Sequence, residues 1–527
     1  MYCRFTFVFL VVFVSSIAAQ TSPPIQFQHS MGGSLDDIAY DISQTNDGGF
    51  ITCGGSTSSD GDLLKTTDVQ HGGNYDYWFA KLDPALNFQW KKHLGGTGSD
   101  VASTIFQLGD GGYIIGGNSN SNDLDVSGNH GIEFDFWIVK LFSSGTTQWQ
   151  KCLGGSGYED FGAMRATADG GFILAGGAQS NDGDVSGNHG SSDFWLVKTD
   201  GAGVIQWQKC YGGTDYEKAA DVRVCTDGGY LMVGFSESNS GDVTGNHGDY
   251  DIWVVKTDAS GNLQWQRSLG GSGYDAANGC IALADGSFIV CGYTGSSDGD
   301  VSNNQGDDDA WIIKLDSGGG ILWSQCLGGS DTDVAAGIEA TTDNGFMVAC
   351  YSKSGDGAVG NNYGFWDYWA VKTDAAGSIE WQKNFGGSLN DVCYAAKPTS
   401  DEGYILTGYS ESQGIDVSGN HGKKDFWVVK LQGVVGVNEV LIPEIILAVY
   451  PQPASGFFNV KITGEALNNY SQLTLDIIDI AGRTLHSQPV VFDAIVKVDC
   501  SLWSSGIYCY RLRNETKVLG NDKFVIQ

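Results

Sequence analysis

Apolar residues gather in short runs along most of the chain, and Gly-rich or polar turns close each run. One set of four runs comprises Val101–Leu108, Tyr113–Gly117, Phe136–Leu141 and the segment TQWQKCL at 147–153. The intervening turns contain Asp-Gly-Gly and Ser-Ser-Gly, which suit tight antiparallel connections rather than helices. The pattern predicts four β-strands in this unit.

The four-strand unit recurs seven times. Its central tryptophan stands at Trp78, Trp137, Trp195, Trp253, Trp311, Trp369 and Trp427, spaced by 59 and then by 58 residues. A Gly-Gly pair recurs in step, beginning at Gly32, Gly95, Gly154, Gly212, Gly270, Gly328 and Gly386. Seven four-stranded repeats predict an all-β fold, a seven-bladed β-propeller over residues 24–432.

The two ends of the repeat region complement each other. The last repeat stops at FWVVKLQG without a fourth strand, whereas PIQFQHSMGG at 24–33 supplies such a strand before the first repeat. We expect the N-terminal strand to complete the last blade, because a closed ring leaves no open array of edges. The strand after each Gly-Gly pair should then line the central channel, with the long polar loops on one face.

A different pattern follows a linker at 433–447. Residues 448–527 contain VYPQPASGFFNVKI, LTLDIIDIAGRTL, VDCSLWSSGIYCYRL and DKFVIQ, alternating runs that predict a small β-sandwich. Four of its motifs stand at Tyr450–Pro453, Asp479–Arg483, Leu502–Tyr508 and Lys523–Val525.

These motifs resemble the C-terminal (type A) sorting domain of type IX secretion substrates. The departures are Gln452, where Asn is usual, and Trp503 inside the turn. The resemblance implies a secreted or surface β-propeller protein of a Bacteroidota-type bacterium, with the type IX secretion machinery as a partner and a sorting domain that is often cleaved.

The first 19 residues predict a signal peptide. Arg4 precedes the apolar run Phe5–Val14, and small residues lead to a cleavage point after Ala19. The run is shorter than the ~20 residues that span a bilayer, and we expect no later transmembrane segment. The expected location is extracellular or the outer-membrane cell surface, after export to the periplasm.

The composition of the chain limits the classes of partner that it is expected to bind. With 62 acidic and 29 basic residues the formal charge is −33, which disfavours nucleic acid and anionic lipid. Divalent cations or basic partners would be attracted, although such a surface also simply keeps a secreted protein soluble. The cysteines show no CxxC spacing, so a zinc site is not expected.

Calcium is the one cofactor that a motif suggests. The third repeat spaces oxygens as in an EF-hand loop, and the fifth repeat does so in part. The candidate ligands are Asp182, Asp184, Ser186, Asn188 and Asp193, then Asp298, Asp300, Ser302 and Asp309. Flanking helices and a twelfth-position Glu are absent. The alternative is that these side chains form Asx-type turns with backbone amides.

One acidic position is common to all repeats. It is occupied by Asp37, Asp100, Glu159, Glu217, Asp275, Asp333 and Asp391. A ring of cation ligands is one interpretation. We favour a structural one, in which each carboxylate accepts hydrogen bonds from turn amides.

What every blade shares is expected to be architecture, so function is sought where a loop departs from the pattern. The first loop, Asp60–Trp78, is longer. The sixth and seventh loops differ by carrying Tyr363, Phe365 and Trp366, and Lys423 and Lys424. Aromatic rings beside polar groups suit sugar stacking. The alternative is that Phe365 and Trp366 fill a gap between loops.

Standard catalytic motifs are missing: the chain has no HExxH, GxSxG elbow or phosphate loop. The sequence therefore favours a non-enzymatic binding or adhesion propeller that recognises a glycan or protein with its long acidic loop face. Two alternatives stay open. One is a glycan-active hydrolase or lyase with carboxylates at the channel mouth, which leave no local signature. The other is a structural surface-layer component.

Overall fold

A computed structural model describes residues 22–63, 74–433, 446–463, 473–479, 483–490, 495–513 and 518–526. The predicted signal peptide and most of the predicted linker lie outside these residues. The chain divides into two compact units, 1–434 and 435–527, each considered by itself. Among the described residues no helix is long and apolar enough to cross a membrane.

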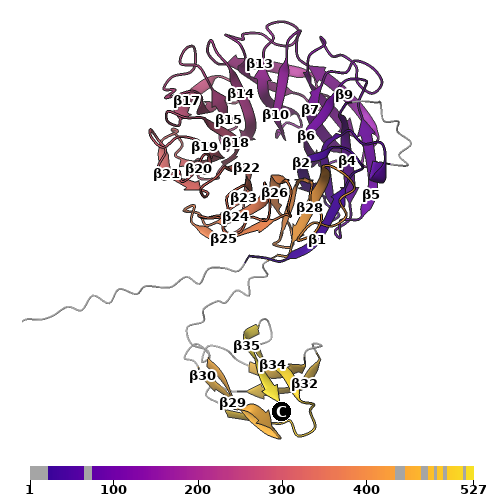
Figure 1. Cartoon of the computed structure of the whole chain (residues 1–527), viewed down its shortest axis with the longest axis vertical. Coiled ribbons are helices and arrows are strands. Elements are labelled where there is room, and N and C mark those ends of the chain that lie inside the picture. Colours follow the sequence, from indigo (N-terminus) through magenta and orange to yellow (C-terminus); the bar gives the residue numbers. More distant parts are fainter. Residues whose placement is uncertain are drawn as a thin grey trace, which may run out of the picture. The chain divides into compact units, whose positions relative to one another are not determined.

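The first unit is a ring of seven four-stranded antiparallel sheets, as predicted (Figure 1). The innermost strands of blades 1 to 7 are β2 (Asp37–Gln44), β6 (Asp100–Gln107), β10 (Glu159–Ala166), β14 (Glu217–Val224), β18 (Asp275–Ala282), β22 (Asp333–Ala340) and β26 (Asp391–Pro398). The second strands are β3 (Phe50–Ser56), β7 (Tyr113–Ser119), β11 (Phe172–Ala178), β15 (Tyr230–Ser236), β19 (Phe288–Thr294), β23 (Phe346–Ser352) and β27 (Tyr404–Ser410).

The outer half of each blade contains the other two strands. The third strands are β4 (Asp76–Leu82), β8 (Asp135–Leu141), β12 (Asp193–Thr199), β16 (Asp251–Thr257), β20 (Asp309–Leu315), β24 (Asp367–Thr373) and β28 (Asp425–Leu431). The outermost are β5 (Phe88–Leu94), β9 (Thr147–Leu153), β13 (Ile205–Tyr211), β17 (Leu263–Leu269), β21 (Ile321–Leu327), β25 (Ile379–Phe385) and β1 (Ile25–Met31). A short 3₁₀ helix, η1 (Gly61–Leu63), follows the first blade's second strand.

The predicted closure of the ring is confirmed. Strand β1 pairs antiparallel with β28, so the N-terminal strand is the outer strand of blade 7. The closing blade also reproduces an internal contact of the others. Trp427 donates its indole N–H to Gln28 at 2.9 Å, as Trp195 does to Gln208 at 2.8 Å within blade 3. The borrowed strand therefore occupies the same position as a continuous one.

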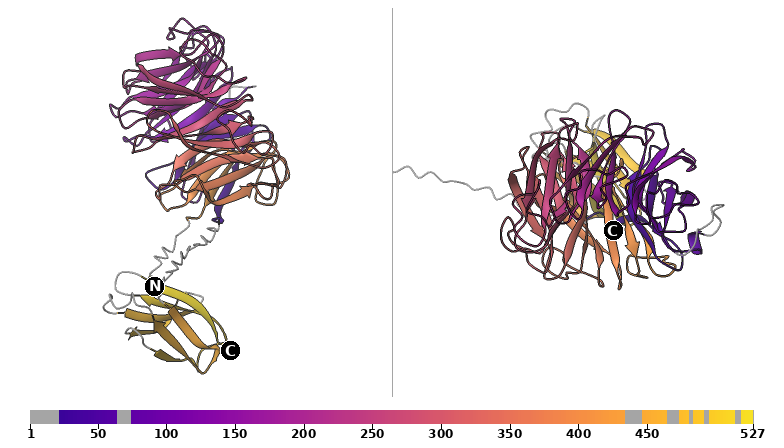
Figure 2. Two further views of the ribbon diagram at one scale, coloured as in Figure 1. Left: turned by 90° about the vertical axis from the view of Figure 1, so that its left-hand side faces the viewer. Right: turned by 90° about the horizontal axis from the view of Figure 1, so that it is seen from above.

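The core lies between blades and is built around the repeated tryptophans, all seven of which are fully buried. Each packs on a neighbouring blade: the rings of Phe194 and Trp253 lie 4.6 Å apart, for example. The lysine at the end of the third strand is equally structural, since the Lys198 ammonium lies 2.8 Å from Asp169 in the turn of its own blade. Seen from the side, the unit is a thick disc (Figure 2).

The second unit is a β-sandwich. Its strands are β29 (Ile446–Ser455), β30 (Phe457–Thr463), β31 (Leu473–Asp479), β32 (Thr484–Val490), β33 (Ile495–Asp499), β34 (Gly506–Arg513) and β35 (Val518–Ile526). In the described residues, two groups of strands, β32-β31-β34-β35 and β29-β30-β33, are joined in strand pairing through β29 and β35. Phe458 and Val498 from one group pack with Leu475 and Tyr510 from the other in a single apolar core.

Candidate functional site

The shared acidic ring is structural, as the sequence predicts. In every blade the carboxylate accepts a hydrogen bond from the second glycine of the Gly-Gly pair: Gly213 N–H to Glu217 at 2.7 Å is one case. In blade 4 a serine at the end of the second strand adds another bond, from the Ser236 hydroxyl to Glu217 at 2.8 Å. These carboxylates are fully buried and tie the blade-to-blade connection to the start of the channel-lining strand.

A second buried carboxylate faces each member of this ring. Oδ1 of Asp193 and Oε2 of Glu217 both lie 2.5 Å from where a Cβ on Gly212 would stand, so the two oxygens are at most 5.0 Å apart. Asp193 Oδ1 has no hydrogen-bond partner among the residues that the structure describes. Burial raises the pKa of Asp193 to about 6, with the charge of Glu217 adding to the effect. The same causes, burial first, raise the pKa of Asp367 to about 7 beside Asp391.

The candidate calcium ligands make hydrogen bonds to different parts of the propeller. Asp182 accepts from the Ser156 backbone at 2.7 Å, and Ser186 accepts from Gln208 at 2.6 Å. The remaining contacts of the third-repeat ligands are also separate: Asp184 accepts from Gly154, Asn188 donates to Ala178, and Asp193 accepts from His189.

In the fifth repeat Asp298 accepts from Ser272 and Asp309 from Gln305, and Asp300 and Ser302 stand in the same loop. Among the described residues no group of three His, Cys, Asp or Glu side chains converges as a metal site. Asn188 forms an Asx-type turn by accepting from Gly190 N–H at 2.9 Å, whereas Asp182 and Asp184 accept from the Gly-Gly connection 26 and 30 residues earlier. Calcium binding stays a prediction.

The sixth loop divides into exposed and packed aromatic residues. Phe365 and Tyr363 are exposed, at 63% and 42%. Trp366 is half-buried, with its ring 5.0 Å from that of Tyr351, and the Lys353 ammonium lies over it at 4.3 Å. Trp366 thus lies at the edge of a larger aromatic cluster, and its role in sugar stacking stays a prediction.

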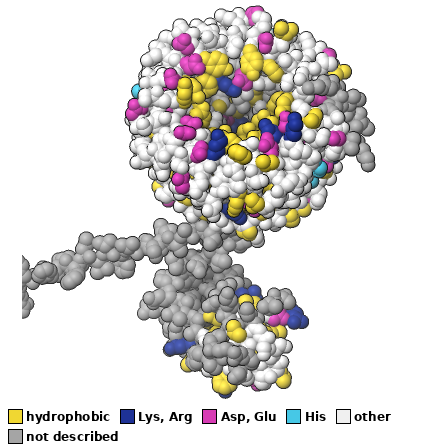
Figure 3. Space-filling view, in the orientation of Figure 1, with side chains coloured by type: hydrophobic (Ala, Val, Ile, Leu, Met, Phe, Trp, Pro, Cys, Tyr) yellow, Lys and Arg dark blue, Asp and Glu magenta, His cyan; other side chains and the backbone are white. Residues whose placement is uncertain are grey.

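This mouth cluster consists of Tyr40, Tyr75, Tyr351, Trp366, Tyr394 and Tyr409, with Ile38 and Val392 beneath. The ring of Tyr394 lies at its centre. It is 5.0 Å from Tyr40, 6.2 Å from Tyr409 and 6.3 Å from Tyr351. The cluster therefore joins blades 6, 7 and 1 at the end of the channel where the inner strands begin. Hydrophobic side chains gather around the central opening on the face seen in Figure 3.

The hydroxyl groups of the mouth cluster are available. None of its five tyrosine hydroxyls bonds to another residue in the part of the chain that the structure describes. Buried tyrosines elsewhere do find partners: Tyr77 donates to Trp137 O at 2.9 Å and Tyr368 to Trp427 O at 2.8 Å. Burial, with the nearby Tyr75, raises the pKa of Tyr40 to about 12. Its hydroxyl therefore stays protonated and able to donate.

The lysines of the seventh loop occupy different places. Lys424 lies with its ammonium 4.7 Å from the Tyr409 ring centroid, so it belongs to the border of the mouth cluster. Lys423 is exposed beside it in the chain, and its carbonyl accepts from Asn420 at 3.2 Å. The structure thus brings Trp366 and Lys424 of the predicted residues to one cluster.

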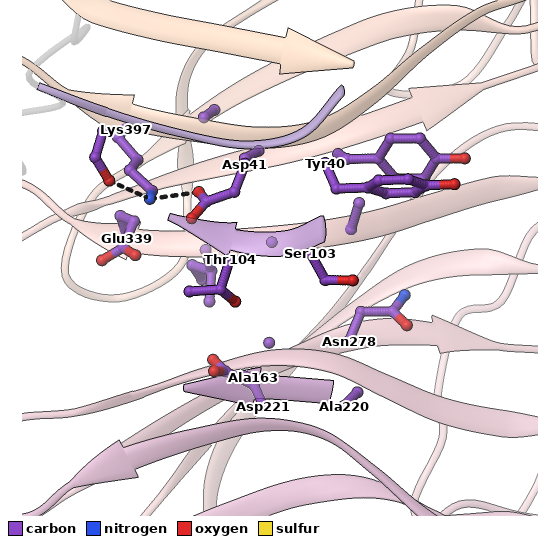
Figure 4. A pocket seen from close by; sticks show the side chains of 18 of the residues that line it. Tyr40, Asp41, Ser103, Thr104, Ala163, Ala220, Asp221, Asn278, Glu339 and Lys397 are labelled. Atoms are coloured by element: carbon purple, nitrogen blue, oxygen red, sulfur yellow. Dashed lines mark hydrogen bonds and ion pairs between the residues drawn. The ribbon is translucent and has the colours of Figure 1, made fainter. Parts of the chain in front are cut away.

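Below the mouth the channel holds a cavity of about 460 Å³ (Figure 4). Tyr40 lies at one end, and charged side chains from the far ends of the inner strands lie at the other. Lys397 contacts Asp41 at 2.5 Å, and Arg165 contacts Asp221 at 2.6 Å. Arg223 reaches both Asp221 and Glu339 at 3.1 Å. Small residues such as Ala163 and Gly279 form the wall between.

Sequence reasoning missed Tyr40, Tyr394 and Lys353. The first two share one inner-strand position that holds Ser103, Gly162, Ala220, Asn278 and Ala336 in the other blades. Comparing the seven repeats position by position would have shown that tyrosine stands here in only two of them. The sixth loop was singled out in the same way, because it differs from the other loops. Their meeting across the closed seam of the ring depends on the propeller geometry.

One curated protein is similar in sequence to part of the chain. A 31% identity over 214 residues links the chain to "Regulatory protein FlaEY" of Caulobacter vibrioides, covering 36% of this chain and 21% of that protein. The chain thus spans about a fifth of that relative's length.

Solved structures that are similar include a puromycin hydrolase (TM-score 0.43, 9% identity, 85% of this chain and 63% of that one). Another is a quinonprotein alcohol dehydrogenase-like protein of Bacteroides thetaiotaomicron (TM-score 0.37, 11% identity, 67% of each chain). The fold assignment rests on the sheet topology itself.

The C-terminal unit has a family match. Residues 448–527 match the secretion system C-terminal sorting domain, as the four motifs predict. Such a domain directs export to the cell surface or extracellular space. The chain is therefore a type IX secretion substrate that carries a seven-bladed β-propeller as its cargo.

Proposed function

We propose that the propeller is a surface or secreted binding module that recognises a glycan at the mouth cluster. The observation that carries this proposal is the set of five tyrosine hydroxyls, arranged around packed aromatic rings, that have no hydrogen-bond partner among the described residues. Sugars offer both an apolar ring face and a rim of hydroxyls, so they match rings and free hydroxyls together. The cavity below, about 460 Å³, is of the size that takes a small ligand.

Tyr363 and Phe365 of the sixth loop, and Lys423 of the seventh, are exposed and stand within three residues of Trp366 or Lys424 in the chain. They would extend contact beyond the first sugar. A protein ligand would use the same exposed residues, but it would not need the free hydroxyls.

The test is a glycan array probed with the whole chain and two variants. Trp366→Ala removes one ring, and Tyr394→Phe removes only a hydroxyl while keeping the ring. Phe142→Ala, exposed at 51% in a turn between the third and fourth strands of blade 2, is the matched control. For the glycans that the native chain binds, we expect binding to be lost in Trp366→Ala, weaker in Tyr394→Phe and unchanged in Phe142→Ala. Unchanged retention with both mouth variants would refute the proposal.

A glycan hydrolase is the second candidate, and Asp308 favours it. This half-buried acid lies before β20, and burial, Asp307 and Asp275 raise its pKa. A general acid needs such a raised pKa together with access to substrate. Release of reducing sugars by the native chain, lost with Asp308→Asn, would establish hydrolysis. Glycan binding without release of reducing sugars would support the binding module.

A further inference from the structure

Two lysines lie on the rings of the mouth cluster. The ammonium of Lys353 is 4.3 Å from the Trp366 ring centroid, and that of Lys424 is 4.7 Å from the Tyr409 ring centroid. They come from neighbouring blades 6 and 7. Both therefore place positive charge on the same surface that carries the free tyrosine hydroxyls.

Neither lysine forms an ion pair with an acid of the described residues. The strand lysines behave differently, since Lys372 contacts Asp343 at 2.8 Å and Lys430 contacts Asp401 at 2.9 Å. In a chain with a formal charge of −33, acids to pair with are abundant. Lys353 and Lys424 thus differ from these strand lysines, although Lys209 and Lys383 of the outer strands also form no ion pair with an acid of the described residues.

Two acids of this surface, Asp308 and Glu411, do not pair with them. Asp308 lies close enough for the charge of Lys353 to act on its pKa, but no contact joins the two. Glu411, near Tyr409, accepts a hydrogen bond from Asn390 at 2.8 Å and is held there. The ammonium groups keep only their contacts with rings, and such contacts are weak at exposed positions.

An ammonium is a compact charge with three donors, suited to a carboxylate or a sulfate. A saccharide bearing such a group would satisfy the lysines with its anion and the tyrosine hydroxyls with its own hydroxyls. It would exchange a weak cation–π contact for a charge-assisted hydrogen bond, which is roughly twice as strong as a neutral one.

We propose that the mouth cluster takes an anionic saccharide, with Lys353 and Lys424 as the residues that select for its carboxylate or sulfate. This inference rests on the proposed glycan-binding function and names the class of its ligand. Neutral glycans of the same backbone are expected to bind more weakly, because they leave both ammonium groups without an anion.

The experiment measures affinity of the whole chain for matched pairs of ligands. One pair is oligogalacturonate and its methyl ester, and the other is a sulfated galactan oligosaccharide and its desulfated form. Lys353→Gln and Lys424→Gln are the variants. Lys209→Gln, an exposed lysine on the outer strand β13, is the control.

We expect the anionic member of at least one pair to bind about tenfold more tightly, and each mouth variant to lose about tenfold for that member only. The ligand pair in which the anionic member binds more tightly shows whether the site selects a carboxylate or a sulfate. Equal affinity within both pairs, or loss with Lys209→Gln alone, overturns the inference while leaving glycan binding in place. Binding of none of the four overturns the inference and removes the support for glycan binding as well.

Discussion

The ammonium of Lys397, in the last inner strand, lies 2.5 Å from the carboxylate of Asp41, in the first. The two residues are 356 positions apart in the chain, and the contact crosses the seam between blades 7 and 1. Lys397 also donates to Ser43 at 3.1 Å, and Ser400 N–H donates to Gln44 at 2.8 Å. The ring is therefore closed on its channel side by side chains as well as on its outside by strand β1.

Lys397→Met is expected to lower the free energy of unfolding by about 2 kcal/mol. The variant leaves the Asp41 carboxylate, 12% exposed, without its cation. A urea titration measures the effect. The double variant Asp41→Asn/Lys397→Met should recover part of the loss, because it removes the uncompensated charge. An unchanged free energy of unfolding in Lys397→Met would show that the ion pair contributes nothing to closure.

Stability is expected to fall as the pH rises from 5 to 8. Burial raises the pKa of Asp37, Asp193, Asp309 and Asp391 to about 6 and that of Asp367 to about 7. Unfolded aspartates titrate near ~3.9. The folded chain thus binds these protons more tightly, and the resulting stabilisation, complete below pH ~4, is lost as the pH passes through 6 to 7.

Melting temperatures across this pH range measure the effect. Asp367→Asn, which keeps an acceptor for Tyr363 N–H, should flatten the pH dependence, whereas Asp215→Asn at an exposed position should not. A melting temperature that increases towards pH 8 would contradict the buried-carboxylate account.

Gly212→Ala is expected to destabilise the propeller by about 3 kcal/mol. A Cβ there would stand 2.5 Å from both Asp193 Oδ1 and Glu217 Oε2, so the buried acids would have to separate. Gly109→Ala is the control, because nothing lies within 4 Å of its Cβ. Denaturant midpoints compare the two. A Gly212→Ala chain as stable as Gly109→Ala would mean that the space beneath the Gly-Gly pair is not restricted.

EDTA is expected to leave the melting temperature unchanged. Asp182 and Asn188 already make hydrogen bonds to Ser156 and Ala178, which hold the loop without a metal. A calcium ion bound only by the folded state would stabilise it by mass action. A melting temperature that falls with EDTA and recovers with calcium would instead assign the loop as a calcium site.

The repeat determined how much of the fold could be predicted. A period of 58 residues, with Trp195 and Gly212 recurring in step, implies identical blades, and the unmatched segment at 24–33 implies ring closure. Each Gly-Gly acid, such as Glu217, was predicted to bind turn amides because an acid recurs at this position in all seven repeats. These features could be predicted because short sequence patterns, repeated along the chain, specify them.

The site was predicted only in part. Trp366 and Lys424 were found because their loops depart from the repeat. Tyr40 and Tyr394 were not, since they stand within strands and are separated by nearly the whole ring. Their rings meet at 5.0 Å only after closure, a long-range contact that no short pattern contains.

The most direct test of the account is a crystal structure of the whole chain soaked with anionic and neutral oligosaccharides. We expect a saccharide to lie on Trp366 and Tyr394, with its hydroxyls bonded to tyrosine hydroxyls. Its anionic group should lie beside Lys353 or Lys424. Saccharide density confined to another surface of the propeller, with the mouth cluster unchanged, would contradict it.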